Sequence, residues 1–218
     1  MVLENYFPFW NKLDKQVQMH LRDVSYPMSA KAGDVLHDGS RECLGLLLIK
    51  SGQIRVYTLS SEGREVTLYR LFERDICLFS ASCVMPNVQF EVIIEAEKDC
   101  ELIVLPSCLF KNLMEESAPV ANYANQLISS RFSEVMWLME QIMWKSFDKR
   151  LAAFLLEECN LNGNNILSIT HEKIANHMGT AREVVTRMLK YFQLEGMVKL
   201  TRGTIEITDE KKLSTLSV

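Results

Sequence analysis

The sequence predicts an α+β protein made of three successive parts, and three observations lead to this prediction. From about residue 26 to residue 105, short runs of β-type residues alternate with glycine and charged turns, which is typical of a jelly-roll β-barrel. A long helical pattern follows. The last third of the chain contains two helices joined by a short glycine turn, and then a hairpin. We therefore expect boundaries that give parts 1–116, 117–146 and 147–218.

The first part opens with a helical pattern and continues as strands. Residues 6–24 repeat apolar side chains on one helical face, which predicts one or two short helices. The strand-like runs after them are 45–49, 53–57, 66–69, 90–94 and 101–105. Gly33, Gly52 and Gly63 mark turns between such runs.

The second part reads as one long helix from 118 to 145, roughly 42 Å long at 1.5 Å per residue. Ser117 is the expected N-cap, and Pro119 is tolerated in the first turn. Apolar residues with heptad spacing predict a dimer seam of Ile128, Phe132, Val135, Met139 and Ile142. The apolar surface is wider than this seam, so we expect the β-domain to cover one side and a partner's helix the other. The alternative is an ordinary buried helix of a monomer.

The third part carries the strongest motif. After an amphipathic helix at 147–159, Thr170 is expected to cap a short helix and Gly179 to allow a tight turn. Thr180 is expected to cap a second helix that ends at Gly196. Residues 198–201 and 204–207 then form a hairpin around Arg202 and Gly203. This order predicts a winged helix-turn-helix.

The second helix of the motif has two different faces. At roughly 100° per residue, Val184, Val185, Met188, Leu189 and Phe192 share the apolar face. Guanidinium, carboxylate and hydroxyl groups on the opposite face are the groups that read guanine, cytosine and phosphate in a major groove. The predicted DNA contacts are Thr170, Thr180, Arg182, Glu183, Thr186, Arg187, Lys190 and Arg202.

Some of these residues also have simpler interpretations. Glu183 stands three residues after Thr180 and could close a capping box. Lys190 could contact phosphate only. We expect His171 and His177 to be surface or capping residues and not metal ligands.

Charge is distributed unevenly around a net value of −4. From Lys145 onward there are 11 Lys and Arg against 9 Asp and Glu, while the first 144 residues hold 13 against 19. A mildly basic third part behind an acidic first part is compatible with local DNA binding.

Composition excludes several other classes. The 218 residues are 48% hydrophobic, which is enough for two real cores, and no signal peptide or membrane span is apparent, so we expect a soluble cytoplasmic protein. Six scattered cysteines form no metal-binding or disulfide pattern, and we expect no metal, no cofactor and no catalytic residues. An enzyme on a cupin-like barrel would need a metal cluster or a nucleophile–base pair.

The chain resembles the CRP/FNR family of bacterial transcription regulators along nearly its whole length. The resemblance is carried by residues 33–39, 46–57 and 181–189. It implies a cyclic-nucleotide-binding-like sensor barrel, a dimerisation helix and base contacts from the residues matching Arg182, Glu183 and Arg187. It also implies a homodimer on pseudo-palindromic double-stranded DNA and contact with RNA polymerase.

Departures from the family pattern bear on the effector. Residues 75–91 match the phosphate-binding cassette of the cyclic-nucleotide-binding members. In this cassette, Phe90 and Glu91 stand where those members carry an Arg-Ser pair, and no basic residue occurs between Arg74 and Lys98. A cyclic phosphate would therefore lack a counter-charge. Val135 and Met136 replace the hydroxyl pair that contacts the base in those members.

Iron–sulfur and haem sensing also lack their residues. No cysteine precedes Cys43, and no histidine occurs between His37 and His171. The expected pocket for an unidentified small molecule is lined by Cys77, Leu78, Phe79, Cys83, Val84, Phe90, Val135 and Met139. Cys77 and Cys83 could sense redox state or simply pack as small hydrophobic residues.

We therefore predict a sequence-specific DNA-binding regulator under the control of a small-molecule or redox effector, and not an enzyme or a membrane protein. The alternative is a cyclic-nucleotide-binding module that acts on a protein partner.

Overall fold

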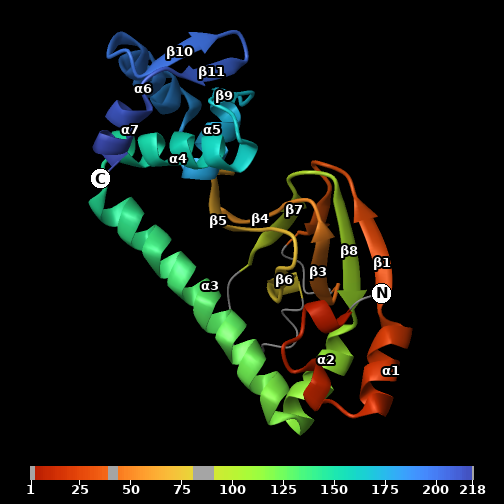
Figure 1. The fold of residues 1–218 in the computed structure, drawn as a ribbon. Helices are drawn as coiled ribbons and strands as arrows, with labels where there is room; N and C mark the ends of the chain where they lie inside the picture. The colour runs from red at the N-terminus through yellow and green to blue at the C-terminus, as the bar shows by residue number, and fades with distance from the viewer. Residues whose placement is uncertain (1–2, 39–43, 81–90, 218) are drawn as a thin grey trace. The chain divides into compact units, whose positions relative to one another are not determined.

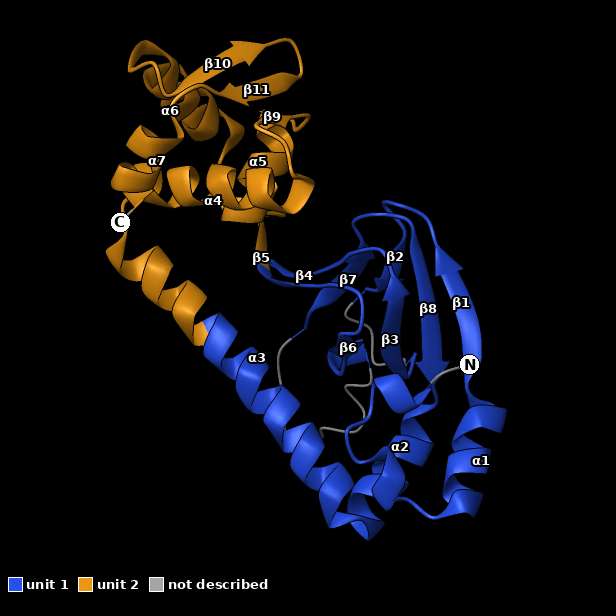
Figure 2. Cartoon of the chain, viewed as in Figure 1, with its two compact units in different colours: residues 1–59, 68–135 blue, residues 60–67, 136–218 orange. Residues whose placement is uncertain are grey.

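The computed structural model describes residues 3–38, 44–80 and 91–217 of the chain (Figure 1). It divides into two compact units, which Figure 2 shows in different colours. Unit 1 holds residues 1–59 and 68–135, and unit 2 holds residues 60–67 and 136–218. Among the described residues, no helix is both long enough and apolar enough to cross a membrane.

Unit 1 is built around two four-stranded antiparallel sheets. One sheet has the strand order β1-β8-β3-β6 and the other has the order β2-β7-β4-β5, so neighbours in the sheets are distant in sequence, as in a jelly roll. The strands are β1 (Tyr26–Ala30), β2 (Val35–His37), β3 (Leu46–Ser51), β4 (Ile54–Leu59), β5 (Glu65–Leu71), β6 (Ile76–Cys77), β7 (Ile93–Ala96) and β8 (Cys100–Leu105). The predicted run 90–94 begins outside the described residues, and its strand starts only at Ile93.

Strand β3 is buried on both of its faces, because its first four residues are all apolar and fully buried. The N-terminal elements η1 (Leu3–Asn5), η2 (Trp10–Lys12) and α1 (Lys15–Val24) add Leu3, Trp10 and Leu21 to the same core. The Tyr6 hydroxyl donates a hydrogen bond of 3.0 Å to the Ile49 carbonyl. An unbroken apolar run in the sequence thus marks the central strand of its sheet.

The turn between β3 and β4 requires a glycine. Gly52 has a φ of +99°, and a Cβ at this position would lie 2.4 Å from the carbonyl oxygen of Asp99. Any side chain would therefore push the turn away from the start of β8. The predicted turn signal at Gly52 has a steric cause.

Two helices follow β8. Helix α2 (Ser107–Glu116) buries Phe110 and Leu113 in the unit 1 core and was not expected from the sequence. Helix α3 (Ala118–Trp144) has 27 residues, about 40 Å at 1.5 Å per residue, which confirms the predicted long helix. The Ser117 carbonyl accepts bonds from the amides of Val120 and Ala121, as the residue at an N-cap does.

Unit 2 has its own apolar core, to which α4, α5, α6, α7 and the small sheet all contribute. The sheet has the order β10-β11-β9 and contains the predicted hairpin. The elements are α4 (Phe147–Asn162), β9 (Ile166–Leu167), α5 (His171–Met178), α6 (Arg182–Leu194), β10 (Val198–Thr201), β11 (Thr204–Ile207) and α7 (Glu210–Ser217). Strand β9 and helix α7 were not expected; Leu167 and Leu213 place them in the core. Residues 60–67 belong to this unit, and Val66 forms a β-bridge with Met178.

Candidate nucleic-acid interface

Helix α5 begins and ends with the residues that the sequence indicated. The Thr170 hydroxyl accepts a bond of 3.1 Å from the Lys173 amide, which satisfies one of the free amides of the first turn. Gly179 closes the helix in the left-handed conformation, with a φ of +65°. A Cβ on Gly179 would lie 2.5 Å from Cγ2 of Val66, so both the backbone and the packing select glycine.

The expected N-cap at Thr180 is wrong. Helix α6 begins one residue later, with Ala181 at its N-cap and no side-chain cap. The Thr180 amide instead donates to the Ala175 carbonyl, five residues back, which completes the closing turn of α5. Ala181 has no side-chain oxygen, so the suggested capping box with Glu183 does not form. Thr180 is half-buried in this turn.

Helix α6 separates into the two predicted faces. Val185, Leu189 and Phe192 are completely buried, while Val184 and Met188 are half-buried beside them. Arg182, Glu183, Arg187 and Lys190 are exposed, and Thr186 is half-buried. A shallow groove runs along the exposed face, lined by Arg182, Glu183, Thr186, Arg187, Lys190, Tyr191 and Leu194.

The cations of this face are available to an outside partner. Within the part of the chain that the structure describes, no ion pair shorter than 4.0 Å involves Arg182, Arg187 or Lys190. An exposed guanidinium without an internal partner keeps all its donors for a ligand such as a guanine edge or a phosphate.

A second groove lies between the two helices of the motif and the wing. It is lined by Ile169, Thr170, His171, Glu172, Arg182, Thr201, Gly203, Thr204 and Ile205. The hydroxyls of Thr201 and Thr204 hydrogen-bond across the hairpin, and Arg202 at its tip is exposed. The structure thus brings Thr170, Arg182 and the base of the Arg202 turn to one groove.

The two histidines of the motif differ in burial. His171 is half-buried and its Nδ1 lies 2.9 Å from the Thr186 hydroxyl. Partial burial lowers the pKa of His171 from its ordinary value, and the charge of Arg182 lowers it further. The expectation that His177 is a surface residue is wrong: it is 6% exposed, with Nδ1 2.8 Å from the Thr67 hydroxyl.

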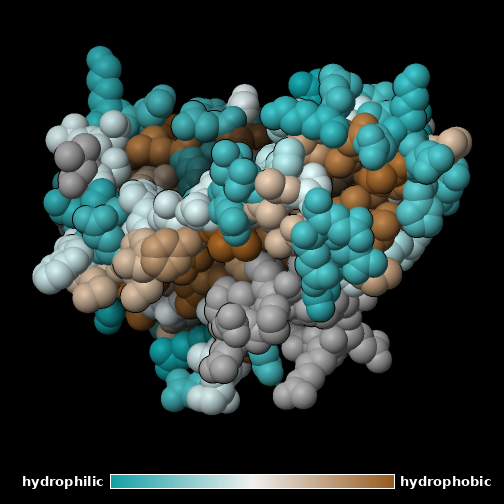
Figure 3. Space-filling model, turned by 90° about the horizontal axis from the view of Figure 1, so that it is seen from below, coloured by the Kyte–Doolittle hydropathy of each residue, from teal (hydrophilic) through white to brown (hydrophobic). Residues whose placement is uncertain are grey.

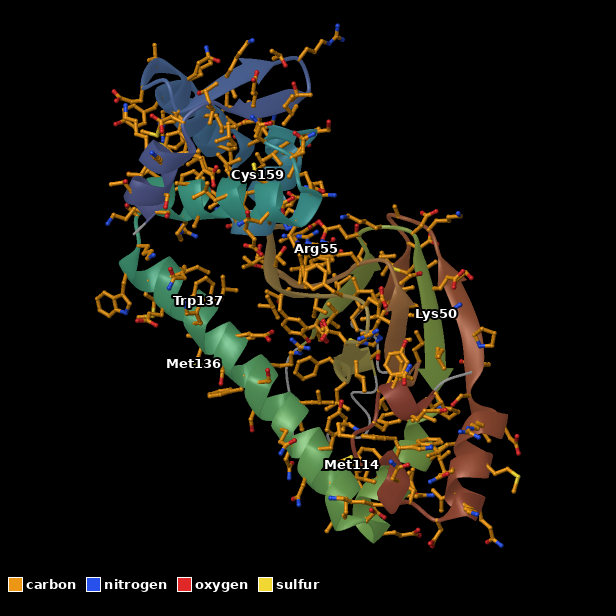
Figure 4. The ribbon with its side chains drawn as sticks, in the orientation of Figure 1. Lys50, Arg55, Met114, Met136, Trp137 and Cys159 are labelled. Atoms are coloured by element: carbon orange, nitrogen blue, oxygen red, sulfur yellow. The ribbon has the colours of Figure 1, made fainter. Side chains whose placement is uncertain are left out.

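The predicted seam on α3 divides into covered and exposed residues. Ile128 and Val135 are half-buried against the core of unit 1, whereas Phe132, Met139 and Ile142 are 64%, 48% and 42% exposed. Hydrophobic side chains reach the molecular surface in several places (Figure 3). Seven of the 15 large exposed ones among the described residues lie on α3, including Met136 and Trp137, which Figure 4 labels: Phe132, Met136, Trp137, Met139, Ile142, Met143 and Trp144.

The expected effector pocket is described only in part. Cys77, Leu78 and Phe79 are buried in unit 1, and Val135 packs on the same core. Met139 lies in the stretch of α3 that belongs to unit 2 and is exposed there. The other three predicted residues, Cys83, Val84 and Phe90, lie outside the described residues.

Burial controls the chemistry of this region. Cys77 is 1% exposed, and desolvation raises the pKa of its thiol. Desolvation likewise raises the pKa of Tyr69, whose ring centroid is 6.2 Å from that of Phe79. A buried thiol with a raised pKa is a poor nucleophile, which favours packing over redox sensing for Cys77.

Arg131 was missed by the sequence analysis. Its guanidinium lies 5.1 Å from the centre of the Tyr69 ring and 3.7 Å from Asp75, and it makes two hydrogen bonds of 2.7 and 2.9 Å to Glu134. It therefore places a cation beside the cassette segment, but two carboxylates already neutralise it. Arg131 is the single basic residue of α3, and this was the signal that could have identified it.

Comparisons with known proteins agree with this architecture. Residues 27–117 match the model of the cyclic nucleotide-binding domain, and residues 149–216 match the model of the Crp-like helix-turn-helix domain. A crystal structure of a protein from Eubacterium rectale, assigned to the crp/fnr family of transcriptional regulators, is 59% identical with a TM-score of 0.96. It covers 98% of this chain, and this chain covers 99% of it.

Two curated relatives are more distant. Electron transport regulator A of Shewanella oneidensis is 28% identical, over 86% of this chain and 74% of its own length. The cyclic AMP receptor protein of Thermus thermophilus is 26% identical, over 79% of each chain. These relatives are regulators and not modules that act on a protein partner, so the alternative reading of the sequence is set aside. The chain belongs to the CRP/FNR family and is a DNA-binding transcription regulator with an effector-binding domain.

Proposed function

We propose that the exposed face of α6 reads base edges in the major groove of a promoter. The observation that carries this is a helix with Val185, Leu189 and Phe192 fully buried on one face. Its opposite face holds Arg182, Glu183, Arg187 and Lys190, which form no ion pair with any described residue. Arg182 and Arg187 would donate two hydrogen bonds each to guanine, and Glu183 would accept one from cytosine. Lys190 would contact phosphate.

The groove beside the wing would hold the DNA backbone. Thr170, at the start of α5, lines this groove, and Arg202 is exposed at the tip of the hairpin; both would contact phosphates. Thr180 contributes to the turn and has no direct role in this proposal.

We propose a two-fold homodimer formed through α3. The exposed apolar residues of this helix extend well beyond what a monomer surface usually leaves in water. A parallel pair of these helices would cover them and would present two copies of α6 to half-sites about 34 Å apart. Binding pseudo-palindromic promoters in the bacterial cytoplasm, contact with RNA polymerase and regulation without catalysis belong to the same proposal.

The sensor would bind a small molecule that is not a cyclic nucleotide. The Thermus relative is named a cyclic AMP receptor protein, but this chain has an exposed glutamate, Glu91, in the cassette region. Arg131, the cation near that region, is already paired with Asp75 and Glu134. A cyclic phosphate would have to displace both carboxylates, and this would offset most of what it gains.

The DNA-binding proposal is tested by selecting genomic fragments with the purified protein and footprinting the strongest one. We expect protection of two inverted half-sites separated by one helical turn. A single asymmetric footprint, or equal affinity for every fragment, would contradict the dimeric sequence-specific reading.

The effector proposal is tested by calorimetric titration with cyclic AMP and cyclic GMP. Neither should bind in the micromolar range to the wild-type protein. Micromolar binding that is lost in Arg131→Gln would show that Arg131 serves the phosphate after all.

A further inference from the structure

We propose that His171 binds a backbone phosphate of DNA as an imidazolium, so that DNA binding takes up a proton. The proposal rests on the DNA interface described above. It assigns a role to a side chain that sequence analysis regarded as a surface or capping residue.

The position of His171 makes a phosphate contact possible. It is the first residue of α5 and lines the groove between the two helices of the motif and the wing. Arg182 lines the same groove from α6, and the wing contributes Thr201 and Thr204. A strand of DNA backbone that follows this groove would pass over an imidazole and hydroxyls, which bind phosphate oxygens, while Arg182 reaches toward the base edges.

The hydrogen bonds around Thr186 determine which ring nitrogen carries the proton. A threonine hydroxyl has one hydrogen, and that of Thr186 donates to the Arg182 carbonyl at 2.9 Å. It can form both bonds together only by accepting the bond of 2.9 Å from His171, which then carries a proton on Nδ1. In the neutral ring Nε2 is then unprotonated, and its lone pair would repel a phosphate oxygen.

Phosphate binding through Nε2 therefore requires a second proton on the ring. The charged residues that line the groove with His171 are Glu172 from α5 and Arg182 from α6, and no charged wing residue lines it among the residues described. In the free protein, burial lowers the pKa of His171 and the charge of Arg182 lowers it further, so both favour the neutral ring. An incoming phosphate places negative charge beside the ring and favours the imidazolium, which opposes the effects of burial and of Arg182.

The sign of the pH effect follows. The pKa of His171 is lowered in the free protein and would be higher in the DNA complex. DNA affinity is therefore greatest at a pH below the pKa of His171 in the free protein. It falls as pH rises through the window between the two values, by up to tenfold per unit of pKa difference for each bound His171.

The test measures DNA affinity from pH 5.5 to 8.5 at constant ionic strength, with the strongest duplex selected by the wild-type protein. His171→Gln can keep the bond to Thr186 and donates from its amide without titrating. We expect it to remove most of the pH dependence while keeping the melting temperature. His20→Gln, an exposed histidine on α1, is the matched control and should retain the wild-type profile.

A direct readout is the imidazole NMR signal that His171→Gln removes. Its pKa should rise when DNA is added, and in the free protein it should also rise in Arg182→Ala. Equal pH profiles of wild type and His171→Gln, or an unchanged His171 pKa in the complex, would overturn the proposal.

Failure of the DNA interface itself has a different signature. In that case Arg182→Ala would keep wild-type affinity on the same duplex. If Arg182→Ala weakens binding while His171→Gln keeps the wild-type pH profile, only the role of His171 is wrong.

Discussion

Arg70 in the sensor barrel and Arg182 on α6 place the same guanidinium group in opposite surroundings. The Arg70 side chain is 7% exposed, and its Nε lies 2.9 Å from Oε2 of Glu97, which is also 7% exposed and accepts a bond from Gln53. Arg182 is exposed and has no ion pair among the described residues. A buried guanidinium needs its counter-charge within the fold, whereas an exposed one can receive it from DNA.

The largest effect expected from this comparison is on stability. Arg70→Met removes the Arg70 charge from beside the buried Glu97 carboxylate and should lower the free energy of unfolding by about 3–5 kcal/mol. Arg70→Met/Glu97→Gln removes both charges and should recover most of the loss. Urea unfolding checks both variants.

A matched surface arginine limits the interpretation of that experiment. The Arg74 side chain is 77% exposed and lies 3.9 Å from Glu73, so Arg74→Met should cost less than about 1 kcal/mol. Equal losses of unfolding free energy in Arg70→Met and Arg74→Met would show that a buried and an exposed arginine contribute alike to stability.

The next effect concerns the exposed residues of α3. Phe132→Glu would place a charge in the proposed dimer interface and should raise the dimer dissociation constant at least 100-fold, or about 2.7 kcal/mol. Phe132 is a better probe than the half-buried Val135, because it does not support the core of its own unit. Sedimentation of a folded monomeric variant is the expected outcome. A wild-type chain that is already monomeric at tens of micromolar would contradict the interface.

The smallest effect is that of a phosphate contact. Lys190→Ala should weaken binding to all DNA sequences alike and lower the slope of log affinity against log salt by about 0.9. The free energy of unfolding should not change, because Lys190 lies on the exposed face of α6. An altered base preference in this variant would make Lys190 a base reader.

Local patterns explain why the third part was the most predictable. The apolar face of α6, the glycine at position 179 and both wing strands were each encoded within a few residues, and the structure confirms them. The predicted N-cap at Thr180 was wrong because this residue could either cap α6 or complete the closing turn of α5. In the structure it completes the turn. The sequence thus predicted the buried and exposed faces of α6, but not the residue at its N-cap.

The sensor was less predictable because its structure depends on distant residues. Strand β1 pairs with β8 across 70 to 78 positions, and no local pattern specifies this register. Arg131 reaches Asp75 and Tyr69 only because α3 packs on the barrel residues of unit 1. The residues of the cassette alone therefore give no sign of a nearby cation.

The central claim is that exposed arginines on α6 read bases, and its most direct test is the base preference of Arg182→Ala in a selection from random duplexes. The account predicts a loss of about 1–3 kcal/mol in specific binding and relaxed preference at one position of each half-site, with stability unchanged. Arg22→Ala, an exposed arginine on α1, should leave the preference intact. An Arg182→Ala variant that selects the wild-type sequence with wild-type affinity would contradict the assignment of α6 as the recognition helix.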